Sequence, residues 1–190
     1  MLLRNKYLIC ICKVLIITLF GVGYAMASGK PFESFDSNKS NSWSFFTDGV
    51  MGGVSSGKAF VSKSGSDNFV RLVGNVSTAN NGGFIQIRHS LKKSLEKNIR
   101  GISLKVRGNG EKYYVFIRTS STLLPWQFYS ASFETSKNWK VVKINLDVFQ
   151  PSSSFLRKTI KSSSIKSIGI VAYGRDHEAK VDISEIHFFK

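Results

Sequence analysis

Residue types that do chemistry are present in this sequence of 190 residues, but their spacing does not match a zinc or calcium site. The histidines His89, His177 and His187 do not form the H-E-x-x-H pattern of a zinc enzyme. The segment 36–41, DSNKSN, lacks the sixth-position glycine and the terminal glutamate of a calcium loop. We therefore expect no catalytic residue, no metal and no cofactor.

Four acidic residues gather near the C-terminus, namely Asp176, Glu178, Asp182 and Glu185. Two carboxyl groups held about 5–10 Å apart in a cleft can hydrolyse a glycosidic bond. Solvated acids on strands and loops are far commoner than such pairs. We expect a protein that is not an enzyme, and an enzyme acting on envelope sugars is the alternative that requires a close carboxylate pair.

A glycine-rich loop at residues 47–57, TDGVMGGVSSG, raises the question of a binding site. Four glycines suggest a tightly folded path in which backbone approaches backbone or a ligand closely. The loop does not complete the phosphate-binding pattern G-x-x-x-x-G-K-[ST], and no helical pattern follows it. It is either a turn that joins two strands or a contact surface for a partner. In the second case Asp48 would accept hydrogen bonds, and Met51, Gly52 and Gly53 would contact the partner.

The first 27 residues have the composition of a secretory signal peptide. Arg4, Lys6 and Lys13 carry positive charge without any acid, an apolar run follows, and Ala-Met-Ala at 25–27 offers a small-residue cleavage site. Both cysteines lie in this leader, so the remaining 163 residues must be held by packing without disulfides. We expect a periplasmic or secreted protein, cleaved near Ala27. The alternative is an uncleaved leader that anchors the protein, which is the route to a membrane that the sequence suggests.

The sequence is strongly basic, with a formal net charge of +15, of which the leader contributes three. Such a surplus attracts anionic partners: nucleic acid, anionic lipid head groups or acidic polysaccharide. The charges are spread among apolar and serine positions, which is also typical of an ordinary solvated surface. Nucleic acid is disfavoured by the expected export and by the lack of an RNP motif, zinc finger or helix-turn-helix pattern.

After a polar, extended segment at 28–42, residues 43–190 have the pattern of a single β domain. Runs of aromatic and β-branched residues, often alternating, are separated by Gly, Ser and Asn clusters. The helix-like segment 90–99 is short and lies between two strands, so we expect a loop with at most one helical turn. The nine strand candidates are 57–64, 68–77, 83–90, 101–108, 112–120, 126–136, 139–146, 165–174 and 180–189. This number and spacing of strands predict an all-β antiparallel sandwich.

Alternation also predicts which side chains share a face, and several strands place an arginine or glutamine beside aromatic residues. The rows are Phe84, Gln86 and Arg88; Tyr114, Phe116 and Arg118; and Gln127, Tyr129, Ala131 and Phe133. Rings supply contact area and polar groups fix the orientation of a ligand. We expect a partner-binding face with the members Arg88, Arg118, Trp126, Gln127 and Tyr129. An arginine would engage a carboxylate or phosphate, and Trp126 or Tyr129 would stack on the partner. The alternative is a set of solvent-facing positions whose rings merely cover the sheet.

An ordered series of motifs resembles the complex I intermediate-associated protein 30 family and spans residues 43–188. The motifs, in chain order, are Trp43, D-x-x-M-G-G-x-S at 48–55, N-G-G-F at 81–84 with Arg88, G-x-x-L-x-V-x-G-x-G at 101–110 with Tyr113, Trp126-Gln127, Tyr129, Phe133, Trp139, Phe149-Gln150-Pro151 and Ile168-Gly169. Each motif is weak alone, but their order and spacing together are specific.

The resemblance implies a jelly-roll fold like that of galactose-binding domains, similar to carbohydrate-binding modules. It also implies a non-catalytic role, because eukaryotic members of the family are assembly chaperones for the membrane arm of respiratory complex I. The expected export would place this chain away from that compartment. We therefore expect a non-enzymatic binding or assembly factor whose partner is a protein or an anionic envelope component. A carbohydrate-binding module of the cell envelope is the alternative.

Overall fold

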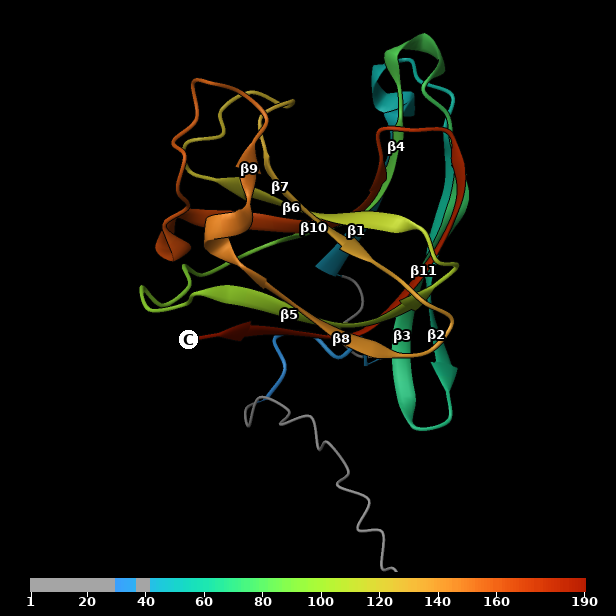
Figure 1. Cartoon of the computed structure of the whole chain (residues 1–190), viewed down its shortest axis with the longest axis horizontal. Coiled ribbons are helices and arrows are strands. Elements are labelled where there is room, and N and C mark those ends of the chain that lie inside the picture. The colour runs from blue at the N-terminus through green and yellow to red at the C-terminus, as the bar shows by residue number, and fades with distance from the viewer. Residues whose placement is uncertain (1–29, 37–41) are drawn as a thin grey trace, which may run out of the picture.

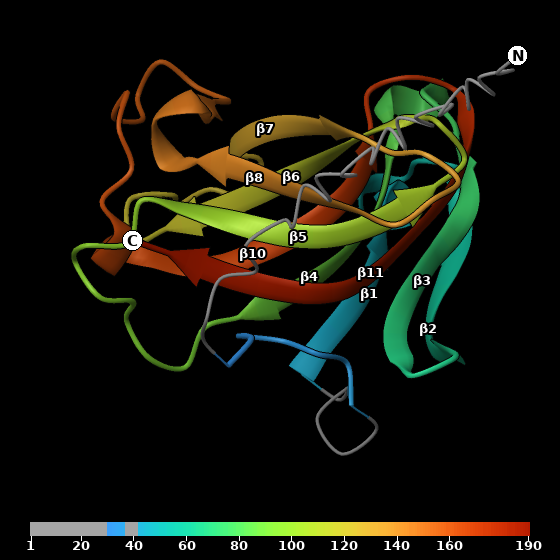
Figure 2. The same cartoon turned by 60° about the horizontal axis from the view of Figure 1, so that its bottom comes forward.

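The computed structural model describes residues 30–36 and 42–190, which form a sandwich of two antiparallel sheets (Figures 1 and 2). The predicted signal peptide at residues 1–27 lies outside the described residues. Within the described ranges, no helix is long and apolar enough to cross a membrane. The all-β jelly-roll prediction is confirmed.

Each sheet is assembled from strands that are distant in the sequence. The six-stranded sheet has the order β1 (Trp43–Thr47), β4 (Phe84–Ser90), β10 (Ile165–Tyr173), β6 (Lys112–Thr119), β7 (Tyr129–Glu134) and β9 (Gln150–Pro151). The five-stranded sheet has the order β2 (Ser56–Ser64), β3 (Asp67–Val76), β11 (His177–Phe189), β5 (Gly101–Gly108) and β8 (Lys140–Asn145). Four short 3-10 turns complete the elements: η2 (Asp48–Met51), η3 (Ala79–Asn81), η4 (Leu146–Val148) and η5 (Ser162–Ser164).

All nine predicted strands are present, and two further strands were not predicted. β1 is only five residues long, and β9 has two residues of which one is a proline, so neither gives a clear alternating pattern. The segment 90–99 forms a loop closed by a turn in which the Ile99 amide donates to the Glu96 carbonyl. The expected strand-to-strand role of the glycine loop is also found, since it joins β1 to β2.

The core lies between the sheets because alternate side chains of the central strands point inward. Ile85 and Ile87 of β4 are buried, as are Val115 and Ile117 of β6, so the rows with Arg88 and Arg118 point outward. Leu104 of β5 meets them from the five-stranded sheet. This packing fixes the outward rows, which carry the candidate site.

The segment before β1 is part of the sandwich wherever it is described. Glu33 pairs with Ile186 of β11 through two backbone hydrogen bonds of 3.0 and 3.2 Å. Its carboxylate accepts hydrogen bonds from the Trp43 indole and the Phe35 amide. Phe35 itself is buried in the core. The predicted polar segment 28–42 therefore supplies core contacts that its composition did not indicate.

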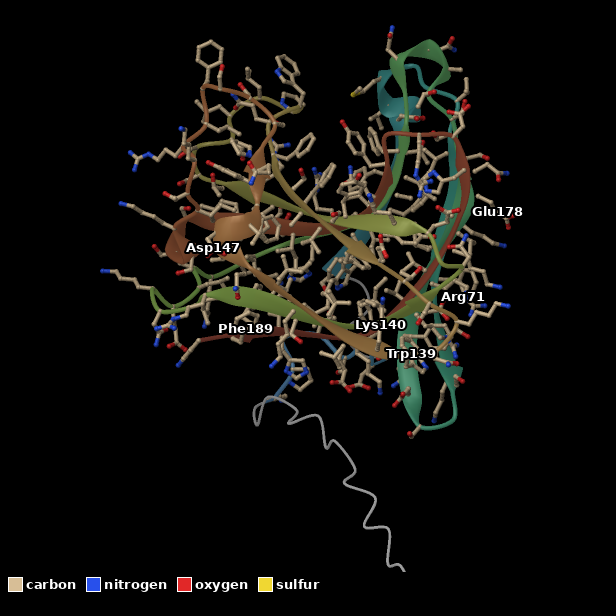
Figure 3. The ribbon with its side chains drawn as sticks, in the orientation of Figure 1. Arg71, Trp139, Lys140, Asp147, Glu178 and Phe189 are labelled. Carbon is tan, nitrogen blue, oxygen red and sulfur yellow. The ribbon has the colours of Figure 1, made fainter. Side chains whose placement is uncertain are left out.

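Asp182 forms a buried ion cluster on the outer face of the five-stranded sheet. Its carboxylate accepts two hydrogen bonds from Arg71, at 2.6 and 2.8 Å, and one from Arg107 at 2.8 Å. Both guanidinium groups lie over the buried ring of Phe69, and Trp139 packs edge-on against that ring. Figure 3 shows Arg71 and Trp139 close together on this sheet. This acid is therefore a structural group.

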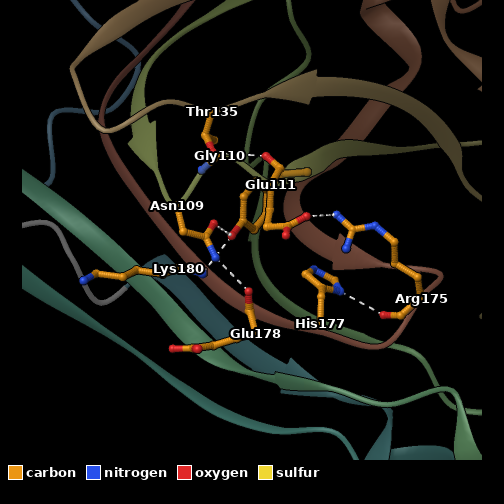
Figure 4. Close-up of polar contacts among 9 residues, drawn as sticks. Asn109, Gly110, Glu111, Thr135, Arg175, His177, Glu178 and Lys180 are labelled. Carbon is orange, nitrogen blue, oxygen red and sulfur yellow. Dashed lines mark hydrogen bonds and ion pairs between the residues drawn. The ribbon is translucent and has the colours of Figure 1, made fainter.

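Tyr113 anchors a polar network at the turn between β5 and β6, and Figure 4 shows the Asn109 and Lys180 members of that network. Its hydroxyl donates to Asn109 Oδ1 and accepts from the Lys180 amide, each at 2.7 Å. Burial raises the pKa of Tyr113 to about 12. Arg175 pairs with Glu111 beside this network.

We expect the Tyr113 phenol to stay protonated until about pH 12, so an ultraviolet titration of the tyrosines should contain a late phase. Because the folded pKa lies above the ordinary value of 10.0, the stability it contributes is complete below pH 10.0 and is lost as the pH rises toward 12. Tyr113→Phe should remove the late phase. A late phase that persists in this variant would contradict the assignment.

Candidate partner-binding face

The outward rows of β4, β10 and β6 form one surface of the six-stranded sheet. Arg88 lies opposite Gly169, and Gly169 lies opposite Phe116, so the three strands meet in register. We call this surface the aromatic–arginine face, with the members Phe46, Gln86, Arg88, Tyr114, Phe116, Arg118, Phe128 and Tyr173. The outward rows of its three central strands contain no acidic residue.

Four rings gather at the centre of this face. Phe116 and Phe128 stack with centroids 4.0 Å apart and ring planes 12° apart. Tyr173 meets Phe116 edge-to-face at 5.3 Å, and Tyr114 meets Tyr173 at 5.8 Å. Val171 lies in the outward row beneath, yet it is fully buried. The cluster is therefore a preformed apolar patch whose rings cover the sheet and leave the Tyr173 side exposed.

Arg88 is the free cation of this face. Its guanidinium lies 4.5 Å from the centroid of the Phe46 ring on β1. In the described part of the chain, no carboxylate forms an ion pair with it. A guanidinium oriented by a ring and lacking a carboxylate can take one from a partner, so the predicted role of Arg88 fits its position.

Arg118 has a structural role that the sequence did not indicate, and its predicted ligand contact stays a prediction. Its guanidinium donates to the backbone carbonyls of Thr122, Leu124 and Pro125 at 2.9–3.4 Å. Burial lowers the pKa of Arg118, and the positive charge of Arg88 lowers it further. The two cations lie on β4 and β6, the strands that flank β10.

Gln127 and Tyr129 also hold the fold and do not line the face. Gln127 Oε1 accepts hydrogen bonds from the amides of Leu123 and Leu124. Tyr129 is in the core, because its row points inward. Trp126, by contrast, is exposed on the loop that Arg118 and Gln127 fold. The predicted stacking role is therefore corrected for Tyr129 and stays a prediction for Trp126.

Asp48 holds the glycine loop together from inside. It is fully buried, and its carboxylate accepts hydrogen bonds from the Ser55 amide and hydroxyl and from the amides of Gly83 and Phe84. Burial alone would raise the pKa of Asp48, but these hydrogen bonds together lower it below its ordinary value. A Cβ on Gly53 would come within 2.3 Å of the Asp48 side chain, so only glycine fits there. Asp48 serves packing, and the predicted contact with a partner does not apply to it.

The remaining side chains of the glycine loop face solvent. Gly52 takes a φ of 87° that ends η2, and this turn leaves Val50, Met51 and Val54 exposed. The loop adjoins the aromatic–arginine face, because Asp48 binds the Gly83 amide and the Gly83 carbonyl accepts from Gly174, next to Tyr173. Met51 remains a candidate contact at the border of the face.

The letters of one catalytic motif and part of a phosphate-binding motif occur in this loop, and the first of these was missed in the sequence. Residues 53–57, GVSSG, match the letters of the G-x-S-x-G elbow, and residues 52–58 contain G-x-x-x-x-G-K without the final Ser or Thr. Both motifs need a following helix, whereas β2 follows here. The Ser55 hydroxyl is buried and bonded to Asp48 and to Ser77. Neither pattern forms its usual site.

The C-terminal acids do not converge. Asp176 accepts hydrogen bonds from the amide and hydroxyl of Thr78, and Asp182 is paired with Arg71 and Arg107. Glu185 contacts His187 at 3.0 Å. Across residues 30–36 and 42–190, no three His, Cys, Asp or Glu side chains are grouped as a metal site.

Two main members of the face, Phe128 and Tyr173, were not singled out from the sequence. Tyr173 could have been found, because it is the last residue of the run IKSIGIVAY and alternation places its side chain on the outward face of β10. Phe128 precedes β7 in a loop, so alternation gave no signal for it.

Comparison with known proteins now assigns the family. The sequence pattern described as complex I intermediate-associated protein 30 matches residues 32–183. The chain belongs to the complex I intermediate-associated protein 30 family. This confirms the resemblance and extends the match to the segment before β1, which contains Phe35 of the core. Among curated proteins, none matches this family member.

Solved structures similar to this family member share its fold at low sequence identity. One is the family 11 carbohydrate-binding module of a cellulosomal cellulase of Clostridium thermocellum, with a TM-score of 0.69, 14% identity, and coverage of 86% of this chain and 96% of that chain. The same type of module in complex with a β-1,3-1,4-mixed-linked tetrasaccharide has a TM-score of 0.67, 14% identity, and coverage of 84% and 94%. An agarase matches with a TM-score of 0.56 and 9% identity over 85% of this chain and 24% of its own.

Proposed function

We propose that this protein is a non-catalytic accessory factor that binds an acidic protein partner on the aromatic–arginine face. The observation that carries the proposal is Arg88, a guanidinium without a carboxylate in the described chain, beside a preformed ring cluster. Aromatic residues and arginine dominate the binding energy of protein interfaces. Family membership supports an accessory role for the chain.

The geometry of the rings favours a protein over a sugar. Phe116 and Phe128 cover each other's faces, and Tyr173 and Tyr114 meet the cluster edge-on. Because of this packing, the patch is irregular and does not present an open, flat ring on which a sugar could stack. Exposed apolar side chains of the glycine loop continue the patch. An apolar centre with a charged rim is the usual anatomy of a protein interface.

Arg88→Ala is expected to weaken partner binding about tenfold or more, with little change in melting temperature. The matched control is Lys143→Ala, which removes an exposed charge from β8 on the other sheet. The measurement is quantitative recovery of cross-linked partners from the native cell, together with thermal unfolding of each variant. If Arg88→Ala loses binding and stability to the same extent, Arg88 has a structural role and the proposal is wrong.

A second candidate is a carbohydrate-binding module of the cell envelope, favoured by the gathering of Tyr114, Phe116 and Tyr173 with Gln86 on one face. A similar fold is found in a module whose complex with a tetrasaccharide is known. This candidate predicts saturable glycan binding. Binding that survives high salt would indicate ring stacking, and binding that fades with salt would indicate the basic surface.

The proposal includes export, with the mature chain starting near Ser28 after cleavage of the leader. Mass spectrometry of the N-terminus of the protein from its own cell tests this directly. A mature start near Ser28 would support export. An intact Met1 recovered together with respiratory complex I subunits would instead favour the assembly role implied by the family.

A further inference from the structure

Two loops at one end of the six-stranded sheet carry the two most exposed large apolar side chains of the described residues. These are Leu123, 82% exposed, and Phe155, 92% exposed. Trp126, 64% exposed, and Leu124 lie on the same loop as Leu123. We call these four residues the apolar tip. Figure 1 shows both loops, residues 120–128 and 152–161, rising together at the upper left.

The apolar tip is held in place by the protein. Ser152 joins the two loops, because its hydroxyl donates to the Trp126 carbonyl at 3.1 Å and accepts from the Phe128 amide at 3.0 Å. Arg118 and Gln127 use their polar groups to fix the backbone at Leu123 and Leu124. Exposure therefore does not come from an unstructured loop, and binding through the tip requires little ordering.

A basic pocket lies between the same two loops. It has a volume of about 180 Å³. Its lining includes Ser120, Ser121, Arg157, Thr159 and Lys161. In the described chain, neither cation of the pocket is paired with a carboxylate. Two cations with free hydroxyl groups form a site suited to a phosphate group.

We propose that this end of the sandwich docks on an anionic phospholipid surface. The apolar tip enters the boundary between headgroups and acyl chains, while Arg157 and Lys161 bind a headgroup phosphate in the pocket. Apolar side chains beside basic residues are the features that hold a peripheral protein at such an interface. The occupant is chosen by charge complementarity, since the tip adjoins the unpaired cations of a chain with a net charge of +15.

This route to the membrane does not use the leader, and the side chains of the apolar tip are not members of the aromatic–arginine face, although Arg118 of that face folds the loop that carries Leu124. Thr119, Ser120 and Ser121, at the start of the 119–128 segment, line the pocket. Arg88 takes no part in it. Arg88→Ala and the apolar-tip variants therefore change different contacts, so partner binding and membrane docking can be tested separately.

Trp126 provides the test, because it is the only one of the three tryptophans in the apolar tip. Full-length protein is titrated with phosphatidylcholine vesicles, with and without phosphatidylglycerol, that contain brominated acyl chains as quenchers. We expect quenching with anionic vesicles, and we expect Trp126→Phe to abolish most of it. The leader is present in every variant, so differences between variants report the apolar tip.

Leu123→Ser combined with Phe155→Ser should raise the lipid concentration for half-maximal quenching about tenfold or more. The matched control is Val50→Ser with Met51→Ser, two exposed apolar residues of the glycine loop, which should leave it unchanged. Arg157→Ser with Lys161→Ser should raise the lipid concentration for half-maximal quenching about tenfold on anionic vesicles and change it little on neutral vesicles. Leu123→Ile with Phe155→Leu should retain binding, which guards against a folding artefact.

Two results would overturn the proposal. One is an absence of Trp126 quenching on anionic vesicles in a folded protein. The other is an equal effect of the tip variant and the glycine-loop control. If Trp126 is not quenched by vesicles and the apolar tip instead cross-links to a protein in the cell, the tip belongs to a protein interface.

Discussion

Asp48→Ala is expected to lower the free energy of unfolding by about 3–5 kcal/mol, because it leaves two buried backbone amides and one partly buried amide without an acceptor. These amides belong to Ser55, Gly83 and Phe84, so the variant would detach the glycine loop from the start of β4. Asp147→Ala is the matched control, since Asp147 is an exposed acid of η4, and it should leave stability unchanged. Chemical denaturation of both variants measures the difference.

The Asp48 effect has a defined pH dependence. Its folded pKa lies below the ordinary value of 3.8, so the stability that it contributes is present above pH 3.8 and is lost as the pH falls further. Asp48→Asn keeps the shape but places an amide NH₂ among hydrogen-bond donors, so it should also destabilise the protein. An Asp48→Asn variant as stable as wild type would show that the carboxylate does not hold the loop, and would return Asp48 to the list of partner contacts.

Asp182→Ala is expected to cost about 3–5 kcal/mol, because it leaves two guanidinium groups without their shared carboxylate. The Asp182 side chain is nearly fully buried, and Arg71 and Arg107 approach it from neighbouring strands on either side. Part of the loss comes from Phe69 and Trp139, which pack on these guanidinium groups.

The control for Asp182 is Asp67→Ala, which removes an equally short ion pair with Lys105. That pair is partly exposed to solvent, so its loss should cost under about 1 kcal/mol. Urea unfolding of the two variants gives the comparison. Similar losses in both would mean that the Asp182 cluster is worth no more than a surface ion pair.

Much of the fold followed from the sequence because runs of aromatic and β-branched residues, often alternating, are separated by Gly, Ser and Asn clusters. Alternation placed Phe84, Gln86 and Arg88 on one face of β4, and the structure shows that this is the outward face. Alternation alone did not show which of the two rows of side chains on a strand faces the core when both rows contain aromatic residues. Tyr129 was assigned to the binding face for that reason, although the apolar neighbours of its row, Ala131 and Phe133, already favoured the core.

The roles of Asp48, Arg118 and Gln127 were beyond the sequence for a different reason. Each binds backbone groups brought close by folding, and backbone partners leave no residue pattern to read. A lone polar residue in a loop therefore looks the same whether it binds a ligand or fixes a turn. The ring cluster was hidden because Phe116, Phe128 and Tyr173 come from three separate segments.

The most direct test of the aromatic–arginine face is site-specific photo-cross-linking in the native cell. A photoreactive phenylalanine analogue replaces Tyr173, 38% exposed on the face, or Val141, 41% exposed on the five-stranded sheet. Thermal unfolding first establishes that both variants are folded. The account predicts discrete protein adducts at Tyr173 that Arg88→Ala weakens, and none at Val141. Adducts at Val141 alone, or equally at both positions, would contradict it.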